Sequence, residues 1–212
     1  MARFEGTVGV LSENFRSIDE EFFVGGDLFL EFCPDFDRES LDHYHVDMLF
    51  RVLTKYDLCA SFIQVIVFDA LIANQDRHCD NWGVLVNRHG VHLAPIYDNG
   101  SSLGFQLTKD DVIKKLHDEE MFRAFTRRSR SIIGLRGKKK PKTLDLLTEI
   151  ANRYPLECAD AVERLEWITE PVVQQVLQLI PDQIMPEIYK VWVCKLVLYR
   201  KEWLQNWYVE RK

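Results

Sequence analysis

Three polar residues near the middle of the chain have the types and the spacing of a phosphoryl-transfer site. Asp76 is followed five positions later by Asn81, and Asp98 stands seventeen positions further on, in a turn rich in Gly and Ser. In such a site one acid orients the attacking hydroxyl and takes its proton, while an Asn and a second acid hold Mg²⁺ against nucleotide phosphates. The spacing therefore predicts chemistry on a phosphate group.

The same residues also have purely structural interpretations. An isolated acid with an Asn five positions later could form an Asx-type turn that caps the preceding helix. His78 lies between Asp76 and Asp80 in an alternating D-x-H-x-D pattern that could bind zinc, but we favour a hydrogen-bonded structural role for it. The second acid and the polar blocks around both acids favour the catalytic interpretation of Asp76 and Asn81.

Two predicted elements position these residues. Residues 58–72 are apolar nearly all round, which is typical of a helix buried at the centre of a domain, and they lead the chain to Asn74. Residues 84–87 and 91–94 are short strand candidates joined by a turn of Asn, Arg, His and Gly, which predicts a hairpin. This hairpin would carry Asn81 and Asp98 at its two outer ends, so the metal ligands could converge.

The rest of the chain is predicted to be mostly helical. Residues 4–11 and 22–32 are β-like and suggest a small strand pair, and Ser40 is a candidate N-cap for a helix over 41–56. We therefore expect a mainly α fold with a small β hairpin at the catalytic centre. Further helices are predicted over 108–117, 119–127, 143–153, 155–166, 170–179 and 186–209.

Composition excludes several classes of protein. The net charge of −6 argues against a protein that coats nucleic acid, and the five cysteines form no CxxC pair, so neither a disulfide framework nor a zinc ribbon is indicated. No apolar run approaches the ~20 residues of a membrane span, and the N-terminus has no secretory signal. We expect a cytoplasmic protein with no membrane partner.

Two blocks of the sequence resemble a known family. Residues 74–83 (NQDRHCDNWG) and 93–102 (LAPIYDNGSS) are similar to the C-terminal lobe of the HipA-like serine/threonine kinases, in which N-x-D-x-H-x-x-N-x-G precedes L-A-P-x-Y/F-D. The resemblance implies a protein-kinase-like large lobe. It suggests a hinge-proximal β segment over 1–35 and a helical lobe over 36–212, with the catalytic loop and the metal-binding turn at 74–104.

The resemblance also implies roles for individual residues. Asp76 would be the catalytic acid, Asn81 would bind Mg²⁺, and Asp98 would occupy the position of the metal-binding aspartate of protein kinases. The supporting residues of the catalytic loop would be Asn74, Arg77 and His78. The implied activity is ATP- and Mg²⁺-dependent phosphorylation of a serine or threonine in a protein substrate, in a toxin–antitoxin setting.

The sequence departs from the family pattern before residue 60. Its glycine pairs there, Gly6 with Gly9 and Gly25 with Gly26, have no phosphate-loop form, and no lysine precedes Lys55. We therefore expect the chain to begin near the hinge, without the N-terminal lobe. Three explanations stay open: a small lobe or antitoxin partner completes the site, the chain is a catalytically dead pseudokinase, or the true start lies upstream of Met1.

A basic segment over 127–142 carries a separate set of hypotheses. Arg136, Lys138 and Lys139 could contact phosphate or substrate, or they could simply form a solvated loop. In a non-catalytic binding module this segment would bind an acidic partner. The IIGLRG run imitates the GXXG loop of an RNA-binding KH domain, but Pro141 interrupts the helix that should follow it.

Overall fold

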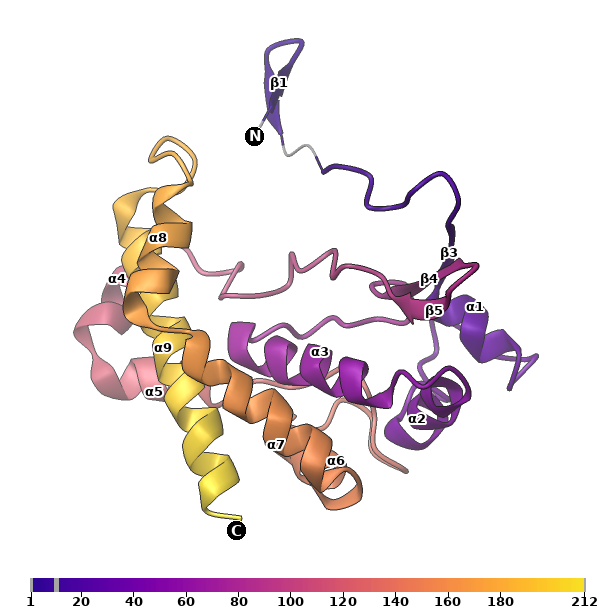
Figure 1. Ribbon diagram of the computed structural model, residues 1–212. Coiled ribbons are helices and arrows are strands. Elements are labelled where there is room, and N and C mark those ends of the chain that lie inside the picture. The colour runs from indigo at the N-terminus through magenta and orange to yellow at the C-terminus, as the bar shows by residue number, and fades with distance from the viewer. Residues whose placement is uncertain (1, 10–11, 212) are drawn as a thin grey trace.

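The computed structural model describes residues 2–9 and 12–211, and helices dominate the described part of the chain (Figure 1). The strands are β1 Ala2–Phe4, β2 Thr7–Gly9, β3 Glu21–Val24, β4 Gly83–Asn87 and β5 Gly90–Leu93. The first helices are α1 Gly25–Leu30, α2 Val46–Lys55 and α3 Cys59–Ile72. The later ones are α4 Lys109–His117, α5 Glu119–Thr126, α6 Thr143–Arg153, α7 Pro155–Glu163, the 3₁₀ helix η1 Arg164–Trp167, α8 Glu170–Gln178 and α9 Glu187–Val209. The mainly α fold class with a small β hairpin is confirmed.

The helices after residue 107 lie where their apolar periodicity and end signals predict them. Thr108 forms a capping box with Asp111 at the start of α4, and the Asp118 side chain accepts the Met121 amide of α5. Pro155 and Pro171 occupy first-turn positions, where a missing amide hydrogen costs nothing. The predicted helix over 155–166 differs at its end, where α7 stops at Glu163 and the chain continues as the 3₁₀ helix η1.

The predicted helix over 41–56 is shorter than expected, and its predicted cap is wrong. α2 begins after His45, whose Nδ1 accepts the Met48 amide at 3.4 Å, whereas Ser40 lies outside the helix. The cause is a tertiary contact. The backbone amide of Gly134 donates to the Tyr44 carbonyl at 2.9 Å, and the Val46 amide donates to the Gly134 carbonyl at 3.0 Å. This parallel bridge holds His45, just before α2, in an extended conformation.

The predicted strand over 22–32 is only partly confirmed. β3 ends at Val24 and pairs with β4 in a three-stranded antiparallel sheet of order β3-β4-β5, and α1 follows immediately. The amides of Gly25 and Gly26 donate to the carbonyls of Trp82 and Cys79 at 2.9 and 3.0 Å, which turns the chain out of the sheet. β1 and β2 pair with each other, and positions 10 and 11 of the predicted segment 4–11 lie outside the described residues.

The predicted central helix and the predicted β hairpin are both present. α3 is buried and packs against α2, α6, α7 and α9, while α9 crosses the molecule beside it (Figure 1). The hairpin β4–β5 turns at Arg88 and His89, where the His89 amide donates to the Asn87 side chain at 2.8 Å. Among the described residues, none of the helices has the length and apolar character needed to cross a membrane.

Candidate active site

The loop predicted to be catalytic, residues 74–83 and called the catalytic loop below, starts where α3 ends. Ala73 has a left-handed backbone (φ 56°), and the Asn74 amide returns to the Asp69 carbonyl at 2.9 Å. The Asn74 side chain donates to the Asp69 carboxylate at 3.0 Å and accepts the Asp76 amide at 3.2 Å. Asn74 therefore joins the end of the buried helix to the residue predicted to be catalytic.

Arg77 connects the catalytic loop to the turn that carries the second acid. Its guanidinium forms a bidentate ion pair with the buried Asp69 carboxylate, at 2.9 Å from Nε and 2.6 Å from Nη2. Nη1 also donates to the carbonyls of Asn81 and Tyr97, at 2.6 and 3.1 Å, and Nη2 donates to Oδ1 of Asn99 at 2.6 Å. We call this set of contacts the Arg77 clamp.

Backbone hydrogen bonds align the same two segments along their length. The Gln75 amide donates to the Ser101 carbonyl at 3.3 Å, and the Leu103 amide donates to the Ile72 carbonyl at 2.8 Å. The segment after β5 thus runs beside the catalytic loop, as Figure 1 shows above α3. Together with the Arg77 clamp, this pairing brings the backbones next to Asn81 and Asp98 to one place.

Among the described residues, the side-chain oxygen atoms that could bind a metal ion accept no hydrogen bond from the protein. The Asn81 Nδ2 donates to the Asp76 carbonyl at 2.8 Å, which orients the side chain and leaves Oδ1 for another partner. Within the described part of the chain, the carboxylates of Asp76 and Asp98 have no hydrogen-bond or ion-pair partner. Asp98 is exposed and has a left-handed backbone (φ 49°). Such oxygen atoms are the hard ligands that suit Mg²⁺, so Asn81 and Asp98 could hold this ion.

Aromatic side chains support the loop from behind. The buried Tyr44 hydroxyl donates to the Arg77 carbonyl at 2.7 Å and accepts the Trp82 indole N–H at 3.0 Å. Burial raises the pKa of Tyr44 well above its usual value, and it raises the pKa of Tyr97 to about 12. Tyr97 keeps its proton and donates to the Asp80 carbonyl at 2.8 Å.

His78 faces the side of the loop that contacts residue 38. Its Nε2 lies 2.6 Å from the Arg38 carbonyl, so this nitrogen carries the proton, and Nδ1 accepts the Asp80 amide at 3.4 Å. The donor atoms of His78, Cys79 and Asp80 lie within 4.8 Å of one another, but both ring nitrogens of His78 already have hydrogen-bond partners within the protein. These contacts support a structural role for His78.

The basic loop is not brought to the catalytic loop. Lys138 pairs with Asp145 at 2.6 Å, Lys139 pairs with Asp42, and Arg136 lies beside His45 in a separate cavity. None of the hydrogen bonds or ion pairs recorded for residues 12–211 joins Arg136, Lys138 or Lys139 to residues 74–83. The Gly134–Gly137 run forms a tight turn closed by the Leu135–Lys138 bridge, unlike a loop between two helices.

Sequence reasoning missed two members of the Arg77 clamp. Asp69 is the one charged residue in the apolar segment 59–72, and a lone acid in a buried helix signals a cation in its neighbourhood. Asn99 carries no such signal, because its partner is decided by the path of the chain after β5.

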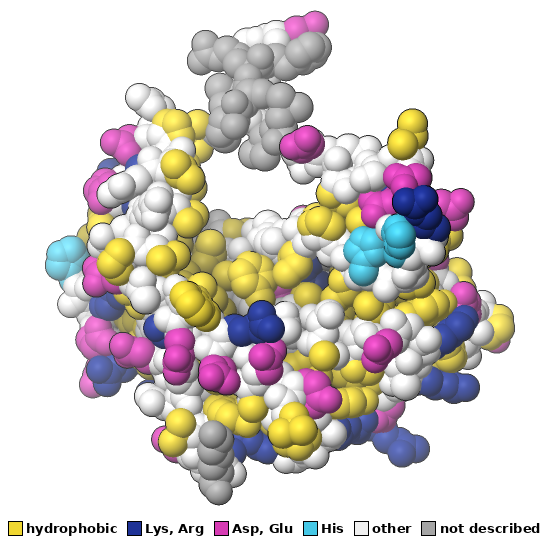
Figure 2. Space-filling model, viewed as in Figure 1, with side chains coloured by type: hydrophobic (Ala, Val, Ile, Leu, Met, Phe, Trp, Pro, Cys, Tyr) yellow, Lys and Arg dark blue, Asp and Glu magenta, His cyan; other side chains and the backbone are white. Residues whose placement is uncertain are grey.

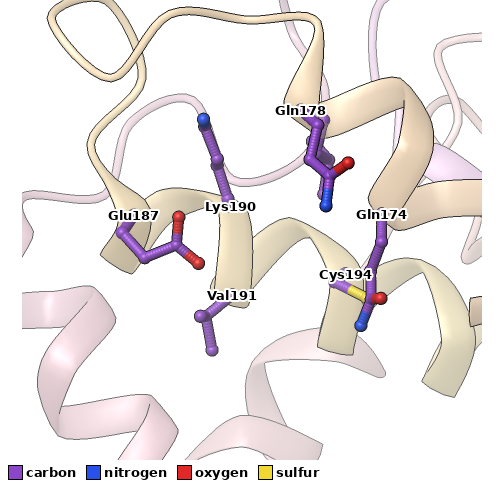
Figure 3. A pocket seen from close by; sticks show the side chains of 7 residues that line it. Gln174, Gln178, Glu187, Lys190, Val191 and Cys194 are labelled. Carbon is purple, nitrogen blue, oxygen red and sulfur yellow. The ribbon is translucent and has the colours of Figure 1, made fainter. Parts of the chain in front are cut away.

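A cavity of about 310 Å³ lies away from this site, between α8 and α9 (Figure 3). Gln174 and Gln178 come from α8, and Glu187, Lys190, Val191 and Cys194 come from α9 (Figure 3). Its lining includes no catalytic-loop residue and no group of facing acids.

Comparisons with known proteins show which proteins this chain is similar to. Serine/threonine-protein kinase CtkA of Helicobacter pylori (strain J99) is 36% identical over 109 residues, which cover 49% of this chain and 32% of that protein. The match therefore spans about a third of the relative's length. The crystal structure of the Helicobacter pylori proinflammatory kinase CtkA superposes with a TM-score of 0.77, covering 93% of this chain and 74% of that one at 23% identity. At this identity the superposition shows a shared kinase-like fold.

A family model matches most of the chain as well. The model described as the HipA-like C-terminal domain covers residues 29–176, which include α2, α3, the predicted catalytic loop, the turn at Asp98 and most of the helices after it. The chain belongs to the HipA-like C-terminal domain family.

Proposed function

We propose that the chain is the large lobe of a HipA-like protein serine/threonine kinase, which transfers phosphate from Mg-ATP to a hydroxyl of a protein substrate. Asp76 orients the acceptor hydroxyl and receives its proton, while Asn81 and Asp98 bind Mg²⁺. Asn74, Arg77 and His78 hold the loop that carries these groups. The kinase named among its relatives makes a serine or threonine the expected acceptor.

The Arg77 clamp is the observation that carries this proposal. Phosphoryl transfer needs little covalent chemistry from the protein, so its rate depends on positioning and on charge stabilisation. The clamp fixes the backbones on both sides of the site through one buried cation. The carboxylates of Asp76 and Asp98 stay without a partner among the described residues, so they remain available to substrate and metal.

The proposal includes a small lobe that covers the nucleotide. The sequence before residue 60 contains no phosphate-loop motif. The adjacent glycines there, Gly25 and Gly26, donate their amides to carbonyls of the catalytic loop. The contacts that cover the nucleotide phosphates would come from a small lobe, supplied either by a segment upstream of Met1 or by a small-lobe or antitoxin partner. A role in a toxin–antitoxin pair is the biological setting that fits this arrangement.

Nucleotide binding and phosphate transfer test the proposal separately. Calorimetry of Mg-ATP binding and transfer of labelled phosphate are measured for the chain alone and mixed with the products of neighbouring reading frames. Asp98→Asn should abolish Mg²⁺-dependent nucleotide binding. Asp76→Asn should keep binding and lower the transfer rate by roughly 10²- to 10⁴-fold, because it removes the group that takes the proton. Asp110→Asn, an exposed acid at the start of α4, is the matched control.

The outcomes separate a kinase from its alternatives. Mg-ATP binding without transfer in any mixture would indicate a pseudokinase that acts by binding partners. Absence of Mg-ATP binding in every mixture would overturn the proposal. Equal loss of transfer in Asp76→Asn and Asp110→Asn would contradict the role given to Asp76.

A further inference from the structure

A second cavity, of about 250 Å³, opens beside the catalytic loop. Ala73 and Gln75 form one side, and they lie just before Asp76 in the chain. Residues 104–106 form another side, just after the turn that carries Asp98. The remaining lining comes from the end of α5, the residues after it and α9, namely Phe125, Thr126, Arg128, Ser129 and Arg200. The cavity is therefore bounded by the two segments that the Arg77 clamp joins.

The lining of this cavity is cationic. It contains Arg128 and Arg200, and it contains no Asp or Glu although the whole chain carries a net charge of −6. Two exposed glutamines, Gln75 and Gln106, add amide donors. The cavity thus has the donor composition of a site for an anion.

Arg200 is fully buried and has no carboxylate partner. Its guanidinium donates to the carbonyls of Ala70 and Thr126 at 2.6 and 2.5 Å, and to Oγ of Ser129 at 3.0 Å. These carbonyls belong to the last turns of α3 and α5, so the negative ends of two helix dipoles offset part of the charge. Burial lowers the pKa of Arg200 to about 10, which leaves it protonated at neutral pH.

Arg128 is the free cation of the cavity. The residue is exposed, and its guanidinium has no hydrogen bond or ion pair among the residues that the structure describes. By contrast, Arg123, on the neighbouring helix α5, is paired with Glu119 at 3.0 Å. Ser129 accepts a hydrogen bond from Arg200, so its own hydroxyl hydrogen can point to a ligand. The cavity therefore presents a guanidinium, a hydroxyl and amide donors to the same space.

We propose that this cavity binds one phosphomonoester group on a side chain of the protein substrate, so that the kinase selects substrates that already carry a phosphate near the acceptor hydroxyl. This inference rests on the proposed function. A phosphomonoester has a charge of about −1.5 to −2 at neutral pH and three acceptor oxygens, which match several donors around a guanidinium better than a carboxylate does. The place of the cavity beside Gln75 puts the bound phosphate next to the loop of Asp76.

The test measures binding of peptides without nucleotide. Three Ser-containing peptides that differ at one position, phosphoserine, serine or glutamate, are titrated into the wild-type chain by fluorescence anisotropy at constant ionic strength. We expect the phosphopeptide to bind at least about tenfold more tightly than the other two, since a charge-assisted contact of this type exceeds a tenfold effect. Arg128→Gln should remove that preference, and Arg123→Gln, which removes the same charge from an exposed pair, should keep it.

Each outcome bears on one proposal. Equal affinity for the three peptides, or equal loss in Arg128→Gln and Arg123→Gln, overturns the phosphate site. If inorganic phosphate competes with peptide binding but the chain shows no preference for the phosphopeptide, the cavity binds an adventitious ion only. That result also overturns the phosphate site. Phosphopeptide binding that depends on Arg128 supports the site even when Mg-ATP binding fails. In that case the proposed kinase function fails and the phosphate site stands.

Discussion

At the scale of single residues, Arg77 decides the geometry of the candidate active site. It is 2% exposed, and its partners come from α3, the catalytic loop and the turn after β5. A buried ion pair is costly to form, and it is retained only when its hydrogen-bonding groups are well satisfied. The Arg77 clamp meets this condition, because a carboxylate, two carbonyls and an amide oxygen surround one guanidinium.

Replacing Arg77 should destabilise the fold strongly. Arg77→Met leaves the Asp69 carboxylate buried without its cation, which costs about 3–5 kcal/mol of unfolding free energy. Urea unfolding followed by circular dichroism measures this loss. Arg123→Met, whose partner Glu119 is exposed, should cost no more than about 1 kcal/mol. Similar losses of unfolding free energy in Arg77→Met and Arg123→Met would show that the Arg77 clamp does not stabilise the fold more than an exposed ion pair does.

The Cys79 thiol should be inert in the folded protein. It is fully buried, and burial raises its pKa to about 12 from the usual 9. Because the folded state holds this proton more tightly, the associated stability is complete below about pH 9 and is lost as the pH rises toward 12. Alkylation at pH 8, read by mass spectrometry, should label Cys33, Cys59 and Cys194 before Cys79 and Cys158. Equal rates without urea would contradict this order.

At the scale of elements, α1 is held against the catalytic loop by close backbone contact. A Cβ on Gly25 would lie 2.6 Å from the Cys79 carbonyl and would overlap the Trp82 ring. Gly83, at the start of β4, is equally close to the β3 backbone. The glycines thus permit β3, α1 and the loop to pack together, and they do not form a phosphate loop.

Gly25→Ala should therefore loosen the support of the catalytic loop. The added methyl group has to push the Cys79 backbone or the Trp82 ring, which costs about 1–3 kcal/mol in thermal or urea unfolding. Gly9→Ala is the matched control, since a Cβ there meets nothing within 4 Å, and its effect should stay within about 0.5 kcal/mol. A Gly25→Ala variant as stable as the control would rule out the close packing.

At the scale of the molecule, α9 unites the helical part of the chain. It packs against α3, α4, α7 and α8, and most of the buried hydrophobic side chains of the described residues form one core. Figure 2 shows the molecular surface hollowed between the α8 side and the three-stranded sheet. The division into segments 1–35 and 36–212 stays a prediction.

Removing core volume from α9 should affect the whole fold. Leu196 is fully buried, so Leu196→Ala should cost about 2–5 kcal/mol of unfolding free energy. Val191 on the same helix is 46% exposed, and Val191→Ala should cost less than about 1 kcal/mol. Each of the two variants should unfold in urea in a single transition. Separate transitions for α9 and for the catalytic loop would show that the core is divided.

Much of the fold follows from local signals in the sequence. The helices after residue 107 were predictable because Thr108, Asp118 and the two helix-initiating prolines act within one turn of each helix end. The buried helix 59–72 and the hairpin of β4 and β5 follow in the same way from apolar runs and turn chemistry. The residue types of the candidate site predict its chemistry, since Asp and Asn oxygens at this spacing suit Mg²⁺, and this stays a prediction.

The tertiary structure decided everything that depends on a distant partner. Residues 25–30 are helical because their glycine amides meet the carbonyls of the catalytic loop, and α2 starts late because Tyr44 and Val46 bond to Gly134. Lys138 and Lys139 pair with acids outside the catalytic loop, whereas Arg77 joins that loop to α3 and to the turn after β5. Local propensity states which groups need partners, but a long-range hydrogen bond or ion pair exists only once the chain has folded.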